Sequence, residues 1–211
     1  MVVRSASVSR RRSRRATAAA TVPTTIPPAT PSTSPTDQPD RPAEVTVYHA
    51  IVRRNLRKSF AEVNRGNYPA IVSQFTPAAE HWFSGSHALG GGRHDNRRIQ
   101  QWYDRLAALL PDLRFELTKV SAKGWPWDTV AFVEWVDHLT DREGNHYSNQ
   151  GVHVIRIAWG KITELHIYCD TALLASVLDT LAAQGVTEAG APPVGDPGPF
   201  PAAAAPAAPA V

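Results

Sequence analysis

Two apolar stretches near the middle of the chain each carry one group that can gain or lose a proton. Asp137 stands in "VEWVDHL" and His153 stands in "QGVHVIRI". Burial raises the pKa of a carboxyl group, and a nearby imidazolium lowers it again. If both side chains face one cavity, the pair could move a proton near neutral pH, with His153 as acid or base and Asp137 orienting it or acting as the base. The simpler alternative is that the two groups satisfy each other and only stabilise the fold.

The stretches that carry Asp137 and His153 have the pattern of β-strands. Apolar residues recur at every second position in "LRFELTKVSA", "TVAFVEWVDHL", "HYSNQGVHVIRIA" and "KITELHIYC", which predicts four antiparallel strands. The dipeptide "WG" predicts a tight turn between the last two. Because side chains on a strand alternate between its faces, Asp137 shares a face with Trp135. His153 shares a face with Tyr147 and Asn149.

The orientation of the third strand stays open at this point. Val152 and Val154 make the face opposite His153 apolar as well. A sheet covered on both sides, by helices on one side and by a second subunit on the other, would produce this pattern. The fourth strand is simpler, since Leu165, Ile167 and Cys169 share one face that we expect to point inward.

The segments around the strands predict helices. Apolar residues recur at three- and four-residue spacing in "VYHAIVRRNLRKSFAEVNRG", and Pro69 marks the first turn of a short helix in "NYPAIVSQF". Asp95 and Asp170 are the expected N-caps of two further helices, the first ended by Pro111. "AAEHWFSG" is expected to form a short strand and "GGGRH" a flexible loop at a pocket rim. This order predicts an α+β domain, with helices packed on one face of a curved antiparallel sheet.

Composition divides the chain into three parts. Residues 1–43 are rich in Arg, Ser, Thr and Pro and carry a net charge of +5, so the rest of the chain, which totals +3, carries −2. Residues 187–211 are rich in Pro and Ala. Neither segment can bury enough apolar surface to fold, so we expect disordered tails around one domain at residues 44–186. The basic start resembles an organellar transit peptide, but a disordered tail or an over-extended start codon is the preferred interpretation.

Several function classes find little support in the sequence. Cys169 is the single cysteine, so no intramolecular disulfide can form, which suits a cytoplasmic location. No apolar run reaches the roughly 18 residues of a membrane span, and no membrane partner is expected. The eight histidines lack the spacing of a metal site. Nucleic acid is not an expected partner, because no aromatic residues alternate with the arginines. Trp125 and Trp127 in "GWPWD" are expected to form either a subunit contact or a pocket lid.

The segment "FVEWVDHLTDREGNHYSNQGVHVIRIAWGKITELHIYCDTALL" resembles the SnoaL-like group of the nuclear transport factor 2-like superfamily. The resemblance depends on "YSN", "IRI", "GKITE" and a helix entry of the form YxDTALL, and it covers about residues 44–184. It implies a cone-shaped, strongly curved antiparallel sheet wrapped around the N-terminal helices, with a ligand pocket at the open end. It also implies that His153 lines the pocket and that the outer face, with Val152 and Val154, packs against a partner in a homodimer.

The resemblance extends to particular positions. Limonene epoxide hydrolases carry an arginine and then an acid where this chain has Trp135 and Asp137, so the acid is kept and the arginine is lost. A second carboxylate of those enzymes and of polyketide cyclases falls at Ile167. Those cyclases use a histidine at the position of His153, where ketosteroid isomerases place an acid. The implied catalytic residues are Asp137 and His153. The implied ligand-binding residues are Trp82, Phe83, Trp135, Tyr147, Asn149 and Ile167.

Three functions follow from these expectations. The first is an isomerase, cyclase or hydrolase that needs no metal or other cofactor and acts by acid/base chemistry on a small lipophilic polyketide-, terpene- or steroid-like compound. The second is a non-catalytic ligand-binding or dimeric accessory domain, favoured by Ile167 and Trp135. The third is an interaction module whose arginine-rich tail contacts acidic partners.

Overall fold

The computed structural model describes residues 43–196. The chain divides into a unit of residues 1–39 and a unit of residues 40–211, and all described residues belong to the second. The predictions made for residues 1–42 and 197–211 therefore lie outside the described residues. Among the described helices, none combines the length and apolar character needed to cross a membrane.

Helices and strands follow the predicted order. The helices are α1 (Ala43–Asn64), α2 (Tyr68–Val72), α3 (Asn96–Leu109), α4 (Thr171–Ala183) and a 3-10 turn, η1 (Thr187–Gly190). The strands are β1 (Phe75–Phe83), β2 (Gly91–Arg93), β3 (Arg114–Trp125), β4 (Asp128–Thr140), β5 (His146–Ala158) and β6 (Lys161–Cys169). Asp95 and Asp170 cap α3 and α4 through hydrogen bonds from backbone N–H groups, which confirms both predicted N-caps.

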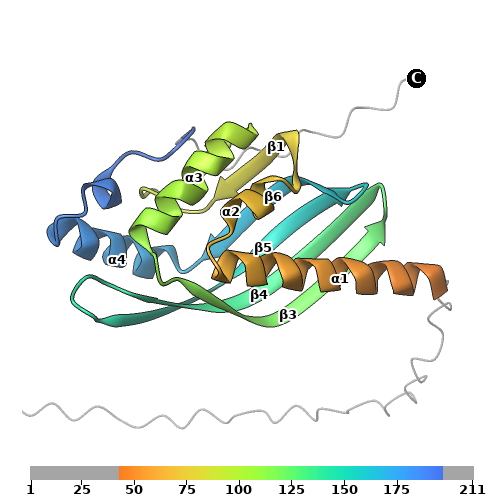
Figure 1. Ribbon diagram of the computed structural model, residues 1–211, viewed down its shortest axis with the longest axis horizontal. Helices are drawn as coiled ribbons and strands as arrows, with labels where there is room; N and C mark the ends of the chain where they lie inside the picture. Colours follow the sequence, from red (N-terminus) through yellow and green to blue (C-terminus); the bar gives the residue numbers. More distant parts are fainter. Residues whose placement is uncertain (1–42, 197–211) are drawn as a thin grey trace, which may run out of the picture. The chain divides into compact units, whose positions relative to one another are not determined.

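The six strands form one curved, open sheet in the order β2-β1-β6-β5-β4-β3. All neighbours are antiparallel except β1 and β6, which are parallel. Figure 1 shows α1, α2 and α3 lying across one face of this sheet. The predicted α+β fold, with helices packed on a curved antiparallel sheet, is confirmed.

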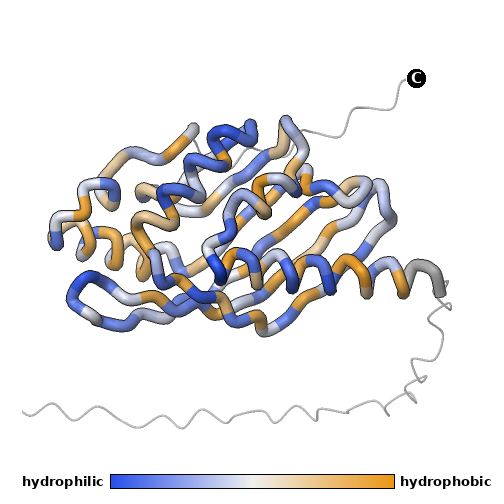
Figure 2. The backbone as a smooth tube through the Cα atoms, viewed as in Figure 1, coloured by the Kyte–Doolittle hydropathy of each residue, from blue (hydrophilic) through white to orange (hydrophobic). Residues whose placement is uncertain are grey.

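The alternation of side chains along each strand determines which side chains face the helices. On β4, the residues Val133, Trp135 and Asp137 are buried, whereas Phe132 and Glu134, which alternate with them, are exposed. Figure 2 shows the same alternation of hydrophobic and hydrophilic residues along the sheet. The inward side chains pack against the apolar stripes of α1 and α3 in one core.

The prediction that "GGGRH" forms a flexible loop is wrong. Residues 91–93 form β2, which pairs with the end of β1, and the Arg93 side chain is fully buried. Its guanidinium donates hydrogen bonds to the carbonyl oxygens of Leu89, Gly90 and Val194. Gly92 also pairs with Asp196. The structure therefore also describes residues 187–196, which lie past the expected boundary at residue 186.

Candidate functional site

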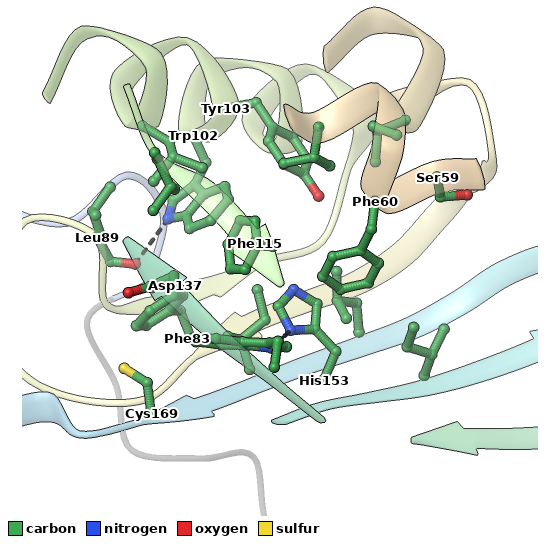
Figure 3. Close-up of a pocket in the computed structure, with 18 of the residues that line it drawn as sticks. Ser59, Phe60, Phe83, Leu89, Trp102, Tyr103, Phe115, Asp137, His153 and Cys169 are labelled. Atoms are coloured by element: carbon green, nitrogen blue, oxygen red, sulfur yellow. Dashed lines mark hydrogen bonds between the residues drawn. The ribbon is translucent and has the colours of Figure 1, made fainter. Parts of the chain in front are cut away.

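A cavity of about 70 Å³ lies between the inner face of the sheet and helices α1 and α3. Its walls are mostly apolar and come from five strands and four helices, so side chains distant in the sequence meet in it (Figure 3). The polar groups that reach it are few: Ser59, Gln74, Tyr103, Asp137, Asn149, His153 and Cys169.

Asp137 is held at one end of the cavity by the pairing of β4 with β5. Its residue partner across the strands is Asn149, whose backbone N–H donates to Asp137 Oδ1 at 3.0 Å. Burial raises the pKa of Asp137 to about 6, against the smaller lowering effects of that N–H and of His138. The other oxygen, Oδ2, accepts no hydrogen bond from any residue in the described range. Asp137 can therefore change its protonation near neutral pH.

His153 is held in one tautomer. The indole Nε1–H of Trp135 donates to His153 Nδ1 at 2.7 Å, so the proton of the neutral ring lies on Nε2. Burial lowers the pKa of His153 to about 3, because a charged imidazolium is poorly solvated among aromatic rings. The ring centroids of Phe60 and Phe115 lie 5.0 and 6.1 Å away. His153 is therefore a neutral donor whose Nε2–H has no acceptor among residues 43–196.

Asp137 and His153 share the cavity but do not form the direct pair that was one possibility from the sequence. His153 lies opposite Val133, whereas Asp137 lies opposite Asn149. Four residues of β4 separate these positions, which is about 13 Å along the strand. Figure 3 shows the two side chains on opposite sides of Phe115. Neither a proton relay between them nor mutual structural pairing fits this register.

Tyr103 was not singled out from the sequence. It lies on α3, stacks on Tyr68 at 5.4 Å and is 5% exposed. Burial raises the pKa of its phenol, so the hydroxyl keeps its proton. The hydroxyl reaches the cavity and makes no hydrogen bond with any other residue of the described part. The available signal was a tyrosine next to Trp102 on the apolar stripe of that helix.

Comparison with known proteins places this fold in a family. Residues 56–165 match the SnoaL-like domain, which is just over half of the chain. The chain belongs to the SnoaL-like domain family. A search of curated proteins finds no match.

Solved structures agree with the fold of this SnoaL-like domain. An NTF2-like protein of unknown function from Burkholderia pseudomallei has a TM-score of 0.53 at 16% identity, covering 59% of this chain and 94% of its own. Another, from Burkholderia thailandensis, has a TM-score of 0.52 at 20% identity, covering 60% and 95%. TerC, co-crystallised with polyporic acid, has a TM-score of 0.51 at 19% identity, covering 57% and 92%. At these identities the similarity concerns the fold.

The SnoaL-like sheet brings most of the predicted ligand-binding residues to the cavity but not all of them. Phe83, Trp135, Asn149 and Ile167 line it. Trp82 does not, because it alternates with Phe83 on β1. Its ring instead lies on the other face of the sheet, 5.4 Å from the ring of Tyr168.

Tyr147 is also placed outside the cavity. It faces the same side of β5 as His153, but it lies opposite Leu139, beyond Asp137, near the end of the hairpin. Its hydroxyl donates to Asp141 Oδ2 at 3.1 Å. Tyr147 therefore stabilises the β4–β5 turn in this structure.

The chemistry available to the SnoaL-like cavity comes from individual hydrogen-bonding groups. Within residues 43–196, no three His, Cys, Asp or Glu side chains cluster in a way that could hold a metal ion. A volume of about 70 Å³ holds a few water molecules and is below the roughly 150 Å³ of a benzene-binding cavity. A larger ligand would have to displace wall side chains.

Proposed function

We propose that the protein binds a small, largely apolar molecule with a carbonyl group and exchanges a proton with it, without a cofactor. The observation that carries this proposal is the set of three polar groups that enter an apolar cavity and have no hydrogen-bond partner among residues 43–196. These are Oδ2 of Asp137, Nε2–H of His153 and the hydroxyl of Tyr103. Few convergent polar groups in an apolar cavity are typical of a small-molecule site.

The roles follow from the protonation states. Above pH 6, Asp137 is a carboxylate that can accept a proton from a C–H group made acidic by a carbonyl. Neutral His153 and Tyr103 can both donate hydrogen bonds to the carbonyl oxygen, where negative charge collects as the C–H bond breaks. Return of the proton from Asp137 to another carbon of the conjugated system completes an isomerisation. The substrate loses and regains one proton, so no electron acceptor is required.

The separation of the groups restricts the substrate. Asp137 and His153 lie about 13 Å apart along the sheet, so the carbonyl and the acidic C–H must be joined by a conjugated chain or ring system. A lipophilic polyketide-, terpene- or steroid-like compound has this form, and its binding requires Phe60 or Phe115 to move. TerC, a protein of similar fold, was co-crystallised with polyporic acid, which supports a small-molecule pocket in this fold.

Deuterium exchange tests the proposal. Conjugated enones of increasing size are incubated with the full chain in D2O, and NMR follows deuterium uptake at the conjugated C–H positions remote from the carbonyl. We expect exchange with the wild type, a loss of at least about a hundredfold in Asp137→Asn, and dissociation constants that agree within a few-fold. Equal exchange rates in both proteins would contradict the role of Asp137.

A second candidate function is binding without catalysis. Ile167 and Trp135 make the cavity wall apolar on β6 and β4, and Asp137 and His153 do not contact each other. A ligand that binds the wild type and Asp137→Asn equally well, and that exchanges no protons with either, would favour this candidate.

We also propose that the protein is a homodimer formed through the outer face of the sheet. Phe132 on β4 is 42% exposed and Tyr168 on β6 is 38% exposed, with the half-buried Val152 and Val154 of β5 between them. Light scattering should give twice the chain mass, and Phe132→Glu should reduce it to one. A wild-type monomer at micromolar concentration would contradict this proposal.

A further inference from the structure

Five of the large exposed hydrophobic side chains belong to segments that lie at one end of the described domain. They are Val47 and Ile51 in the first turns of α1, Trp125 and Trp127 in the β3–β4 hairpin, and Trp159 in the β5–β6 turn. We call this set the tryptophan end. His49 of α1 bonds the carbonyl oxygen of Gly124 at 2.8 Å, which places the helix start against the hairpin. Figure 1 shows both turns and the start of α1 on the same side of the domain.

The three tryptophans form one cluster. The rings of Trp125 and Trp127 stack at 5.6 Å with an interplanar angle of 7°, and Trp159 lies 6.0 Å from Trp127. They are 50, 54 and 74% exposed, whereas the other three tryptophans of the chain are buried. None of the three lines the cavity, so the expected role of Trp125 and Trp127 as a pocket lid is not what the structure shows.

Trp159 occupies a backbone conformation that disfavours it. Its φ is 51°, and the φ of Gly160 is 78°, so the two residues form a turn in which both lie in the left-handed region. Asparagine or glycine fits the first position, and a bulky residue there costs about 1 kcal/mol or more. The exposed indole gains little packing within the domain that would offset this cost.

Positive charge surrounds the tryptophan end. Residues 45–61 of α1 hold Arg53, Arg54, Arg57 and Lys58 and no acidic residue. Lys123 and Lys161 flank the two tryptophan-bearing turns and are exposed. Glu44 lies in the first turn of α1, and two other acidic groups, Asp128 and Glu164, lie 3.9 and 3.0 Å from the guanidinium of Arg156. The net charge of these residues around the aromatic cluster is therefore basic.

We propose that the tryptophan end binds the surface of an anionic lipid bilayer. Indole rings favour the membrane–water interface because they have an apolar body and one polar N–H. Each nearby Lys or Arg contributes about 1 kcal/mol of attraction to anionic headgroups. Such contact needs no membrane-spanning helix. A neutral protein partner would use the aromatic cluster but would leave the basic residues unmatched.

Brominated lipids test this surface in the full chain. Vesicles of phosphatidylglycerol and brominated phosphatidylcholine quench only tryptophans that enter the bilayer, so attraction of the basic N-terminal segment alone gives no quenching. We expect quenching in the wild type. Combined Trp125→Ala, Trp127→Ala and Trp159→Asn substitutions should remove it and weaken sedimentation with vesicles at least about tenfold.

Two further variants keep the test decisive. Arg142→Glu changes an exposed basic residue of the β4–β5 turn, outside the tryptophan end, and should bind like the wild type. Arg54→Glu with Lys58→Glu leaves the tryptophans in place and should weaken binding about tenfold or more. Absence of bromine quenching in the wild type would overturn the proposal. The proposal would also be overturned if vesicle affinity were unchanged both in the triple tryptophan variant and in Arg54→Glu with Lys58→Glu. Self-association through these tryptophans without vesicle binding would overturn it as well.

Discussion

Two histidines of this domain are neutral for the same reason and yet differ in what they can do. His81 on β1 and His153 on β5 each accept a hydrogen bond at Nδ1, from Arg93 at 2.9 Å and from Trp135 at 2.7 Å. Both therefore carry their proton on Nε2. Burial lowers the pKa of each below its ordinary value of 6.5.

The two histidines differ in what surrounds their Nε2 atoms. At His81, which is fully buried, Nε2 is closed in by protein and has no hydrogen-bond partner in the described domain. At His153 the same atom faces the cavity. A buried, perturbed histidine is thus not sufficient evidence of a functional site. What distinguishes His153 is empty space next to an unpaired donor.

Replacing Arg93 should have the largest effect on stability and should show that the region around His81 has a structural role. Arg93→Met leaves the carbonyl oxygens of Leu89, Gly90 and Val194 without their donor, so we expect a loss of about 3–5 kcal/mol in the free energy of unfolding. Urea unfolding measures the loss, and hydrogen exchange should become fast at residues 187–196.

Arg105→Met is the matched control. Arg105 also bonds two carbonyl oxygens, those of Ala88 and Pro192, but from a partly exposed position. We expect a loss below about 1 kcal/mol. Equal losses in the two variants would contradict a special role for Arg93.

Replacing Asp137 should increase the free energy of unfolding at neutral pH, whereas replacing Arg93 should decrease it. Its pKa in the folded protein is about 6, above the ordinary 3.8, so the folded state is stabilised at low pH and loses that stability as pH rises from about 4 through 6. The charged carboxylate then costs about 3 kcal/mol at pH 7.5. Asp137→Asn should raise the free energy of unfolding at pH 7.5 by about 2–3 kcal/mol and have little effect at pH 4. A destabilised variant at pH 7.5 would show that the carboxylate serves the fold.

Replacing Trp135 should have a smaller effect on stability, and it should change the tautomer of His153. Trp135→Phe removes the donor to His153 Nδ1 and should cost about 1–2 kcal/mol. Long-range nitrogen–proton NMR should then show a mixture of His153 tautomers. Trp102→Phe also removes a buried indole bond, to Leu89 O at 2.8 Å, but it should leave the His153 tautomer unchanged. A tautomer unaffected by Trp135→Phe would contradict the assigned role.

Much of the fold and part of the site followed from alternation along the strands. The alternation predicted that Asp137 shares a face with Trp135, and the family resemblance implied that His153 lines the pocket. The separation of the two groups could also have been obtained from the sequence, because the five-residue turn at 141–145 pairs Thr140 with His146 and so determines the register.

Other features of the structure could not be predicted from the local sequence pattern. Tyr103 reaches the cavity because α3 crosses the sheet, and this depends on packing between distant segments. β2 is too short and glycine-rich to show a period, so Arg93 is recognisable only from its pairing with β1. Trp82 was assigned to the cavity together with Phe83, although neighbouring residues of one strand face opposite sides.

The central claim is that Asp137 is a desolvated carboxyl group that can exchange a proton in a ligand-accessible apolar cavity. Carbon NMR of the Asp137 side-chain carboxyl across pH 3 to 8, with Asp137→Asn to assign the signal, measures its pKa directly. We predict a value near 6. A value at or below the ordinary 3.8 would show a solvated or ion-paired carboxylate and would contradict the claim.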